Sequence, residues 1–243
     1  MRTVIAAALA VMAGGATAGS TYAWSDTNVG GNNRGGDMTS ISTRFNQTTQ
    51  TFRWEVTYSD QITEGFTLAV NDGPNPKGTR HELALIYFDA TGFDSSGNSS
   101  DVNVSAYEYS GNNDSRSWES PGVLLNQSGD AGFILNASAQ DNANGSRTFV
   151  LEFNASTINS FYDTSTYQDW EGVQFDSSIG VWFHSFKDLT TNYDANGMLS
   201  QWSGVDGWLD FSNQNTTLVP MPLAGAMGAA GLGLVAGRRR RLS

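Results

Sequence analysis

The chain has 243 residues, and its 24 acidic residues against 13 lysines and arginines give a formal net charge of −11. A surface this acidic repels phosphate backbones, so we expect no nucleic-acid partner. The chain has no cysteine, which excludes disulfides, thiol catalysis and cysteine-ligated zinc.

The N-terminal residues have the pattern of a secretory signal peptide. Arg2 precedes an apolar run over residues 4–13, and small residues end the segment at Ala16, Thr17 and Ala18. The apolar run is too short to cross a hydrocarbon core of about 30 Å. We therefore predict a signal peptide over residues 1–18 with cleavage between Ala18 and Gly19, the alternative being a retained anchor.

The next 200 residues, 19–218, are predicted to form one extracytoplasmic domain. Between residues 37 and 212, apolar and polar residues alternate in short runs separated by turns rich in Gly, Asn, Asp and Ser. Many short alternating runs predict an all-β fold, a β-sandwich or jelly roll. The expected strands are 41–45, 52–58, 66–70, 83–88, 102–106, 133–135, 149–153, 179–186 and 208–211. Residues 83–88 are apolar throughout, as in a central strand covered on both faces.

The connections between these strands carry turn and helix signals. Residues 144–145 (Asn-Gly) and 194–197 predict hairpin tips. Residues 26–37 are too polar and too glycine-rich to pack, so we expect a loop there. A helical turn capped by Ser156 is expected up to Tyr162, and a second turn over residues 164–170.

Residues 71–78 form the most unusual connection, with two prolines and two glycines that restrict the backbone. Basic and polar side chains cluster in and after it, in a chain with few basic residues. This pattern is interpreted as a candidate ligand loop for a polar ligand such as a sugar, formed by Asp72, Asn75, Lys77 and Arg80. The alternative is a rigid connection in which the lysine pairs with a neighbouring acid.

Catalytic signals are weak, and we expect no catalytic residue and no enzyme activity. A glycosidase needs two carboxylates about 5–10 Å apart, and Glu55 or Glu82 supplies at most one of them. No G-x-S-x-G sequence is present, and His184 lies in an aromatic strand where a packed or surface imidazole is expected. A secreted glycosidase is therefore the least favoured hypothesis.

No cofactor is predicted, with one structural calcium ion as a weaker hypothesis. Residues 94–101 and 141–145 are rich in oxygen ligands, although their spacing differs from an EF-hand. The alternative is that both segments are solvated turns.

The tryptophans divide into two groups by their surroundings. Trp54 and Trp182 lie in apolar strands and are expected in the core. The other group lies in polar surroundings and is predicted to be exposed for stacking on a sugar: Trp118, Trp170 and Trp202.

The C-terminal segment predicts a membrane span. Residues 219–237 carry no charge and are followed by four consecutive arginines, Arg238, Arg239, Arg240 and Arg241. Nineteen residues are long enough to cross a bilayer as a helix, and the arginines favour a cytoplasmic end.

Without Arg2 and these four arginines, eight basic residues face 24 acidic ones, a formal net charge of −16 for the exported domain.

The same segment resembles a PEP-CTERM sorting domain, closest to the VPLPA variant. The resemblance rests on Val219, Pro220 and Pro222, the apolar stretch and the arginine cluster, with Met221 and Leu223 where the variant usually has Leu and Ala. The sequences GPNPKG and ELALIYFDA are also similar to other PEP-CTERM proteins of unassigned role.

This resemblance implies an exported surface or extracellular-matrix protein of a Gram-negative bacterium. An exosortase in the inner membrane is expected to recognise the proline motif and release the protein outward. Proteins with such tails usually accompany exopolysaccharide and biofilm genes, so an exopolysaccharide is the implied second partner. The alternative function is a carbohydrate-binding module for matrix polysaccharide.

Overall fold

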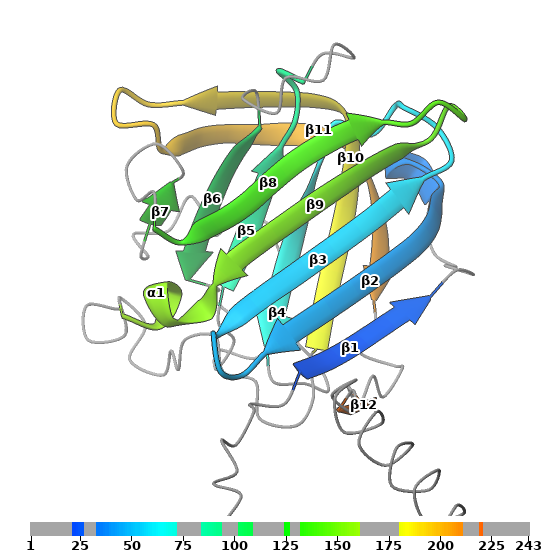
Figure 1. Cartoon of the computed structure of the whole chain (residues 1–243). Helices are drawn as coiled ribbons and strands as arrows, with labels where there is room; N and C mark the ends of the chain where they lie inside the picture. Colours follow the sequence, from blue (N-terminus) through cyan, green and yellow to red (C-terminus); the bar gives the residue numbers. More distant parts are fainter. Residues whose placement is uncertain are drawn as a thin grey trace, which may run out of the picture.

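The computed structural model describes residues 21–26, 33–71, 84–93, 102–108, 124–126, 132–160, 180–210 and 219–220. These residues form two six-stranded sheets in which every neighbouring pair of strands is antiparallel (Figure 1). The two sheets pack face to face, so the prediction of an all-β sandwich is confirmed.

Each sheet combines strands from distant parts of the chain. The order in sheet A is β12 (Val219–Pro220), β1 (Thr21–Asp26), β2 (Met38–Asn46), β3 (Thr51–Tyr58), β9 (Arg147–Asn154) and β8 (Ile134–Asp141). The order in sheet B is β11 (Leu199–Asp210), β10 (Gly180–Tyr193), β4 (Gly65–Asn71), β5 (Ala84–Asp89), β6 (Asn103–Glu108) and β7 (Leu124–Asn126). The chain crosses between the sheets after β3, β7, β9 and β11.

Aromatic side chains fill the space between the two sheets. Strands β3 and β9 alternate strictly between buried and half-buried residues, which directs every second side chain inward. Phe149 of sheet A contacts Phe66 and Phe88 of sheet B at centroid distances of 6.1 and 5.3 Å. Trp54, predicted in the core, is fully buried and lies 5.1 Å from Phe183.

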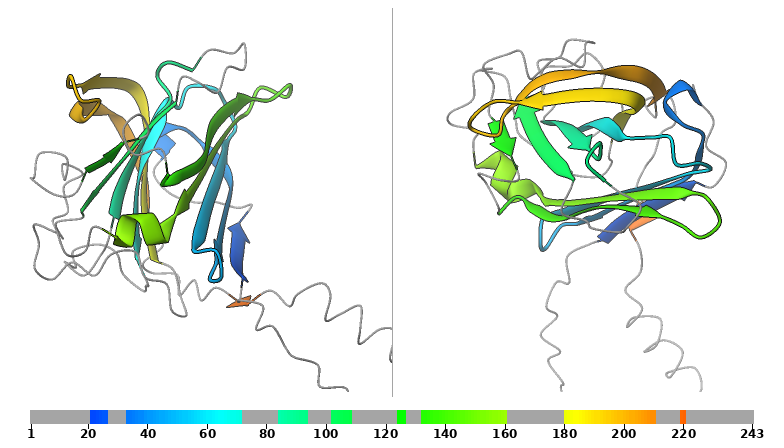
Figure 2. Two further views of the ribbon diagram at one scale, coloured as in Figure 1. Left: turned by 60° about the vertical axis from the view of Figure 1, so that its left-hand side comes forward. Right: turned by 90° about the horizontal axis from the view of Figure 1, so that it is seen from above.

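Strand β5 is buried on both faces, as its unbroken apolar sequence predicts. Ile86 and Phe88 belong to the sandwich core, whereas Leu85 and Tyr87 point to the other side of sheet B. That side is covered by the distal half of the β10–β11 hairpin, residues 187–203, which we call the hairpin arm (Figure 2). The hairpin bends where its register shifts after Lys187 and where Asp188 has a φ of 51°.

All nine predicted strands are present, with shifted ends. Strands β10 and β11 are longer than predicted because the polar residues of the hairpin arm weaken the apolar alternation. Strands β1, β7 and β12 were not predicted, and the last two have only three and two residues. The two hairpin tips are confirmed, with Gly145 and Gly197 at φ values of 85° and 79°.

The helix α1 (Ala155–Asn159) is present but begins differently from the prediction. Its N-cap is Asn154, whose side chain accepts a hydrogen bond from the Thr157 amide at 3.2 Å. Ser156, the predicted cap, lies inside the first turn. The second predicted turn, residues 164–170, lies outside the described residues.

The prediction that residues 26–37 cannot pack is wrong for the end of this segment. A short 3-10 helix, η1 (Asn33–Gly35), packs against β10 and β11, and Gly35 and Gly36 are buried. A Cβ atom on Gly35 would lie 1.9 Å from the Ser185 carbonyl oxygen. The glycine therefore allows a backbone approach that no side chain permits.

We predict that Gly35→Ala lowers the free energy of unfolding by about 1–3 kcal/mol, because the backbone must shift to admit the methyl group. Gly132→Ala is the control, since no atom lies within 4 Å of its added Cβ. Urea denaturation of both variants measures the difference. Equal urea midpoints for Gly35→Ala and Gly132→Ala would contradict the close packing of η1.

Candidate functional site

The outer face of sheet A carries a polar hollow of about 230 Å³. In Figure 1 this face points toward the reader, and no described helix or strand crosses in front of β2, β3 and β9. Six side chains from these strands and from the β2–β3 turn line the hollow: Arg44, Asn46, Thr49, Thr51, Arg53 and Glu152.

Three charged residues form one row across the strands of this face. Arg44 of β2 lies directly opposite Arg53 of β3, which lies opposite Glu152 of β9. The Arg53 guanidinium donates to Glu55 at 2.7 Å and to Glu152 at 3.2 Å. Burial alone lowers the pKa of Arg53, but these two carboxylates outweigh it and raise the pKa. Arg53 is therefore held as a fixed cation between two acids.

The β2–β3 turn builds the wall of the hollow. The Asn46 side-chain oxygen accepts hydrogen bonds from the Thr48 and Thr49 amides at 2.9 and 3.2 Å, which folds the chain back toward β3. Thr49 and Thr51 then lie with their hydroxyl groups 2.9 Å apart. Sequence and turn chemistry thus place two hydroxyls at the edge of the charged row.

The lining combines hydrogen-bond donors, acceptors and hydroxyl groups on an open face. The hollow is smaller than the roughly 300–1,000 Å³ of pockets that bind drug-sized ligands. Glu55 and Glu152 are the acidic groups beside Arg53, and each accepts a hydrogen bond from it. The arrangement therefore suits binding of one polar unit of a larger ligand.

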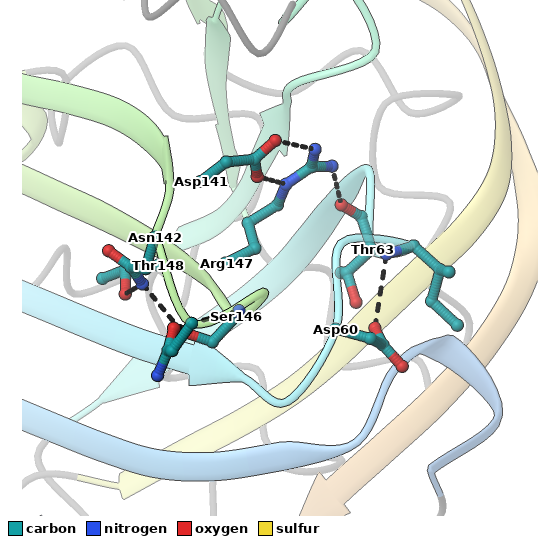
Figure 3. Close-up of polar contacts among 9 residues, drawn as sticks. Asp60, Thr63, Asp141, Asn142, Ser146, Arg147 and Thr148 are labelled. Carbon is teal, nitrogen blue, oxygen red and sulfur yellow. Dashed lines mark hydrogen bonds and ion pairs between the residues drawn. The ribbon is translucent and has the colours of Figure 1, made fainter.

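A second polar cluster, drawn in Figure 3, joins the β8–β9 hairpin to the β3–β4 connection. Arg147 donates to both carboxylate oxygens of Asp141, at 2.6 and 3.1 Å, and to the Thr63 carbonyl oxygen at 2.9 Å. Its guanidinium also lies 5.2 Å from the centre of the Phe93 ring. Arg147 is only 9% exposed, so this cluster ties together parts of the fold.

This cluster bears on the calcium hypothesis for residues 141–145. Both Asp141 oxygens accept from Arg147, and the Asn144 side-chain oxygen accepts from the Ser146 amide and hydroxyl. The side-chain oxygens of Asp141 and Asn144 therefore serve the turn itself. No group of three or more His, Cys, Asp or Glu residues in the described part of the chain is arranged to hold a metal ion. Residues 94–101 lie outside that part.

A third cluster fixes the hairpin arm to sheet B. Asp89, at the end of β5, is buried and accepts hydrogen bonds from the Thr91 amide and hydroxyl at 2.9 and 2.8 Å. Its other oxygen accepts from the Thr191 hydroxyl at 2.7 Å and the Tyr193 hydroxyl at 2.6 Å. Four donors satisfy the carboxylate, so its role is structural.

Most of the predicted site residues lie outside the described residues. They are Ala18, Gly19, Asp72, Asn75, Lys77, Arg80, Pro222, Arg238, Arg239, Arg240 and Arg241. Val219 and Pro220 form β12, which pairs with Ala23 and Tyr22 of β1. Within the described ranges, no helix has the length and apolar character needed to cross a bilayer.

The structure corrects one aromatic prediction. Trp202, predicted to be exposed for stacking, is 8% exposed and makes edge contacts with Tyr87 and Phe186. Its polar neighbours in sequence belong to the solvent side of the hairpin arm. The side chains of Trp118, Trp170 and Trp182 lie outside the described part.

His184, expected to be packed or at the surface, is half-buried on β10. Its Nδ1 atom lies 3.3 Å from a carboxylate oxygen of Asp206 on the neighbouring strand β11. The contact joins two strands of one sheet, as expected of a structural imidazole.

Sequence reasoning did not identify the polar hollow. Arg44 and Arg53 lie at polar positions of two predicted strands, at equal distances from a short polar turn. A hairpin over this turn pairs them, so the sequence could have predicted that they are neighbours. Glu152 is 99 residues from Arg53, and no local pattern predicts that β9 lies beside β3.

No protein-family model matches the chain. No curated protein matches it either. Among solved structures, it is similar to one described as "pH-induced modulation of Streptococcus parasanguinis adhesion by Fap1 fimbriae", at 11% identity and a TM-score of 0.21. That similarity covers 84% of this chain and 100% of the other chain, and at this TM-score it supports no inference.

We predict that Arg147→Met lowers the free energy of unfolding by about 3–5 kcal/mol, because the Asp141 carboxylate, whose side chain is only 11% exposed, is left without its partner. Arg53→Met is the control: its ion pairs are more exposed, and we expect a loss of about 1 kcal/mol or less. Chemical denaturation at neutral pH compares the variants. A similar loss for both would contradict the structural role of Arg147.

Buried tyrosines predict a loss of stability in alkali. Burial raises the pKa of Tyr58, Tyr107 and Tyr193, and the Asp89 carboxylate raises that of Tyr193 further. The unfolded chain releases these protons near pH 10, whereas the folded chain keeps them, so the stability present below about pH 10 is lost as the pH rises.

Each tyrosine contributes about 1.4 kcal/mol per pH unit, so the three lower the free energy of unfolding by about 4 kcal/mol per pH unit above pH 10. Tyr193→Phe should reduce this slope by about one third. Urea denaturation between pH 9 and 11 measures the slope, and an unchanged slope in the variant would contradict the assignment.

Proposed function

We propose that this chain is an exported, non-enzymatic surface or extracellular-matrix protein of a Gram-negative bacterium. The observation that carries the proposal is the pair of terminal signals around one acidic β domain: the export signal ending at Ala18, and the proline motif, apolar stretch and arginine cluster from Val219. An exosortase-type enzyme is the proposed processing partner.

The proposed route takes the chain through two locations. The apolar C-terminal stretch holds it in the inner membrane as a helix, with the arginines on the cytoplasmic side. Cleavage at the proline motif then releases the acidic domain to the cell surface or the medium. A formal charge of −16 on the released domain supports solubility and weak adhesion to an anionic cell surface.

The arrangement of sheet A supports processing at both ends. Strand β1 begins at Thr21, shortly after the proposed cleavage point, and β12 contains the first two residues of the proline motif. These two strands pair at one edge of the sheet. The aromatic core residues that the structure describes lie in strands further from that edge.

The jelly-roll-like form of the sandwich is part of the same proposal. Its support is the crossing of the chain between sheets after β3, β7, β9 and β11, which places strands distant in sequence side by side.

A carbohydrate-binding module for matrix polysaccharide is the second candidate function. The polar hollow on sheet A favours it, because it offers donors, acceptors and hydroxyl groups on a sheet face whose central strands no described helix or strand covers. This function is compatible with the first, since a matrix protein is retained by binding the polymer around it.

We predict that mass spectrometry of the mature protein finds a start near Gly19 and an end before Arg238. The double variant Pro220→Ala, Pro222→Ala should accumulate unprocessed in the inner membrane, because the enzyme loses its recognition motif. Met221→Leu, which restores the residue usual in the VPLPA variant, is the control and should be processed normally. An intact C-terminus in the unmodified protein would contradict processing, and full-length protein in the cytosol with Met1 attached would contradict export.

A further inference from the structure

We propose that the polar hollow on sheet A binds a uronate unit of an acidic polysaccharide, with Arg44 as the residue that contacts the sugar carboxylate. The inference rests on the proposed function, which brings the domain into contact with extracellular polymer, and it names the class of ligand.

The first step concerns the two arginines of the hollow. Arg44 and Arg53 lie directly opposite each other on neighbouring strands, an arrangement in which like charges destabilise a sheet. Arg53 is neutralised by Glu55 and Glu152. Arg44 is exposed, and no ion pair or hydrogen bond joins it to another described side chain. Arg53 already has its counter-ions, so Arg44 is the cation of the hollow that lacks one among the described side chains, and the site favours a negatively charged group there.

The second step concerns the shape of that group. A guanidinium offers paired N–H donors that match the two oxygens of a carboxylate, and this pairing is stronger than a neutral hydrogen bond. Beside Arg44 lie the Asn46 side chain and the hydroxyls of Thr49 and Thr51. These groups suit the ring hydroxyls that accompany a carboxylate on a uronic acid.

The third step separates an acidic sugar from a neutral one. An aromatic ring offers an apolar face that can cover the C–H side of a neutral sugar ring. None of the six residues that line the hollow is aromatic. Selection of the ligand therefore depends on charge and hydrogen bonding.

The fourth step concerns the form of the ligand. The hollow lies on the outer face of sheet A. No described helix or strand crosses in front of β2, β3 and β9 (Figure 1), so a chain can continue beyond the bound unit. The acidic body of the protein repels a polyanion at long range, and the attraction comes from the local arginine. Binding is therefore expected to be modest and to weaken as salt screens the contact.

The test uses the full chain purified in mild detergent and titrated with oligogalacturonate and alginate oligomers, at low salt and at 0.5 M NaCl. Arg44→Gln should weaken binding about 10- to 100-fold, since one charge-assisted contact is lost. Arg44→Lys keeps the charge but loses the paired donors, so its affinity should lie between those of the unmodified protein and Arg44→Gln. Lys187→Gln, which removes a positive charge from sheet B, is the matched control and should bind like the unmodified protein.

Three results would overturn the inference. The first is equal affinity of Arg44→Gln and the unmodified protein, with both folded by circular dichroism. The second is equal binding of a neutral galactan oligomer. The third is full displacement of the uronate by millimolar inorganic phosphate, which would make the hollow a general oxyanion site.

The outcome is separable from that of the proposed function. A protein that is exported and trimmed at both ends but binds no uronate contradicts only this inference. A protein that binds uronate through Arg44 but stays full-length in the cytosol contradicts the export and processing proposal instead.

Discussion

The fold depends on aromatic contacts between the two sheets. Phe149 of sheet A packs against Phe66 and Phe88, which stack on each other at 4.5 Å in sheet B. Side chains alternate along each strand, so every second side chain points away from the space between the sheets. Each sheet therefore has an outer face that must be covered or exposed to water. The two sheets meet this requirement differently.

Sheet B covers its outer face with its own chain. Apolar residues such as Leu85 and Tyr87 lie on that face, and the hairpin arm closes over them, held by hydrogen bonds to the buried carboxylate of Asp89. Sheet A has polar residues at the corresponding positions, including Arg44, Arg53 and Glu152, and no described helix or strand covers its central strands. Its outer face is therefore the surface on which we place ligand binding.

The proposed function and the inferred ligand have separate foundations. Export and processing are proposed from the two terminal segments, whose meaning lies in length, charge and motif. Uronate binding is inferred from side chains that three strands bring together. If both proposals hold, an acidic domain outside the cell is held in the matrix by a few local contacts rather than by overall charge.

The sequence by itself determined nine of the twelve described strands, the hairpin tips at residues 144–145 and 194–197, and the double burial of β5, because alternation and turn chemistry are local properties. Only the tertiary structure decided which strands are neighbours, that Trp202 is buried under a polar segment, and that Gly35 packs against Ser185. It also decided the candidate site, since Glu152 reaches Arg53 across 99 residues of chain. The physical reason is that strand pairing between distant segments depends on how whole faces fit together, which no short stretch of residues encodes.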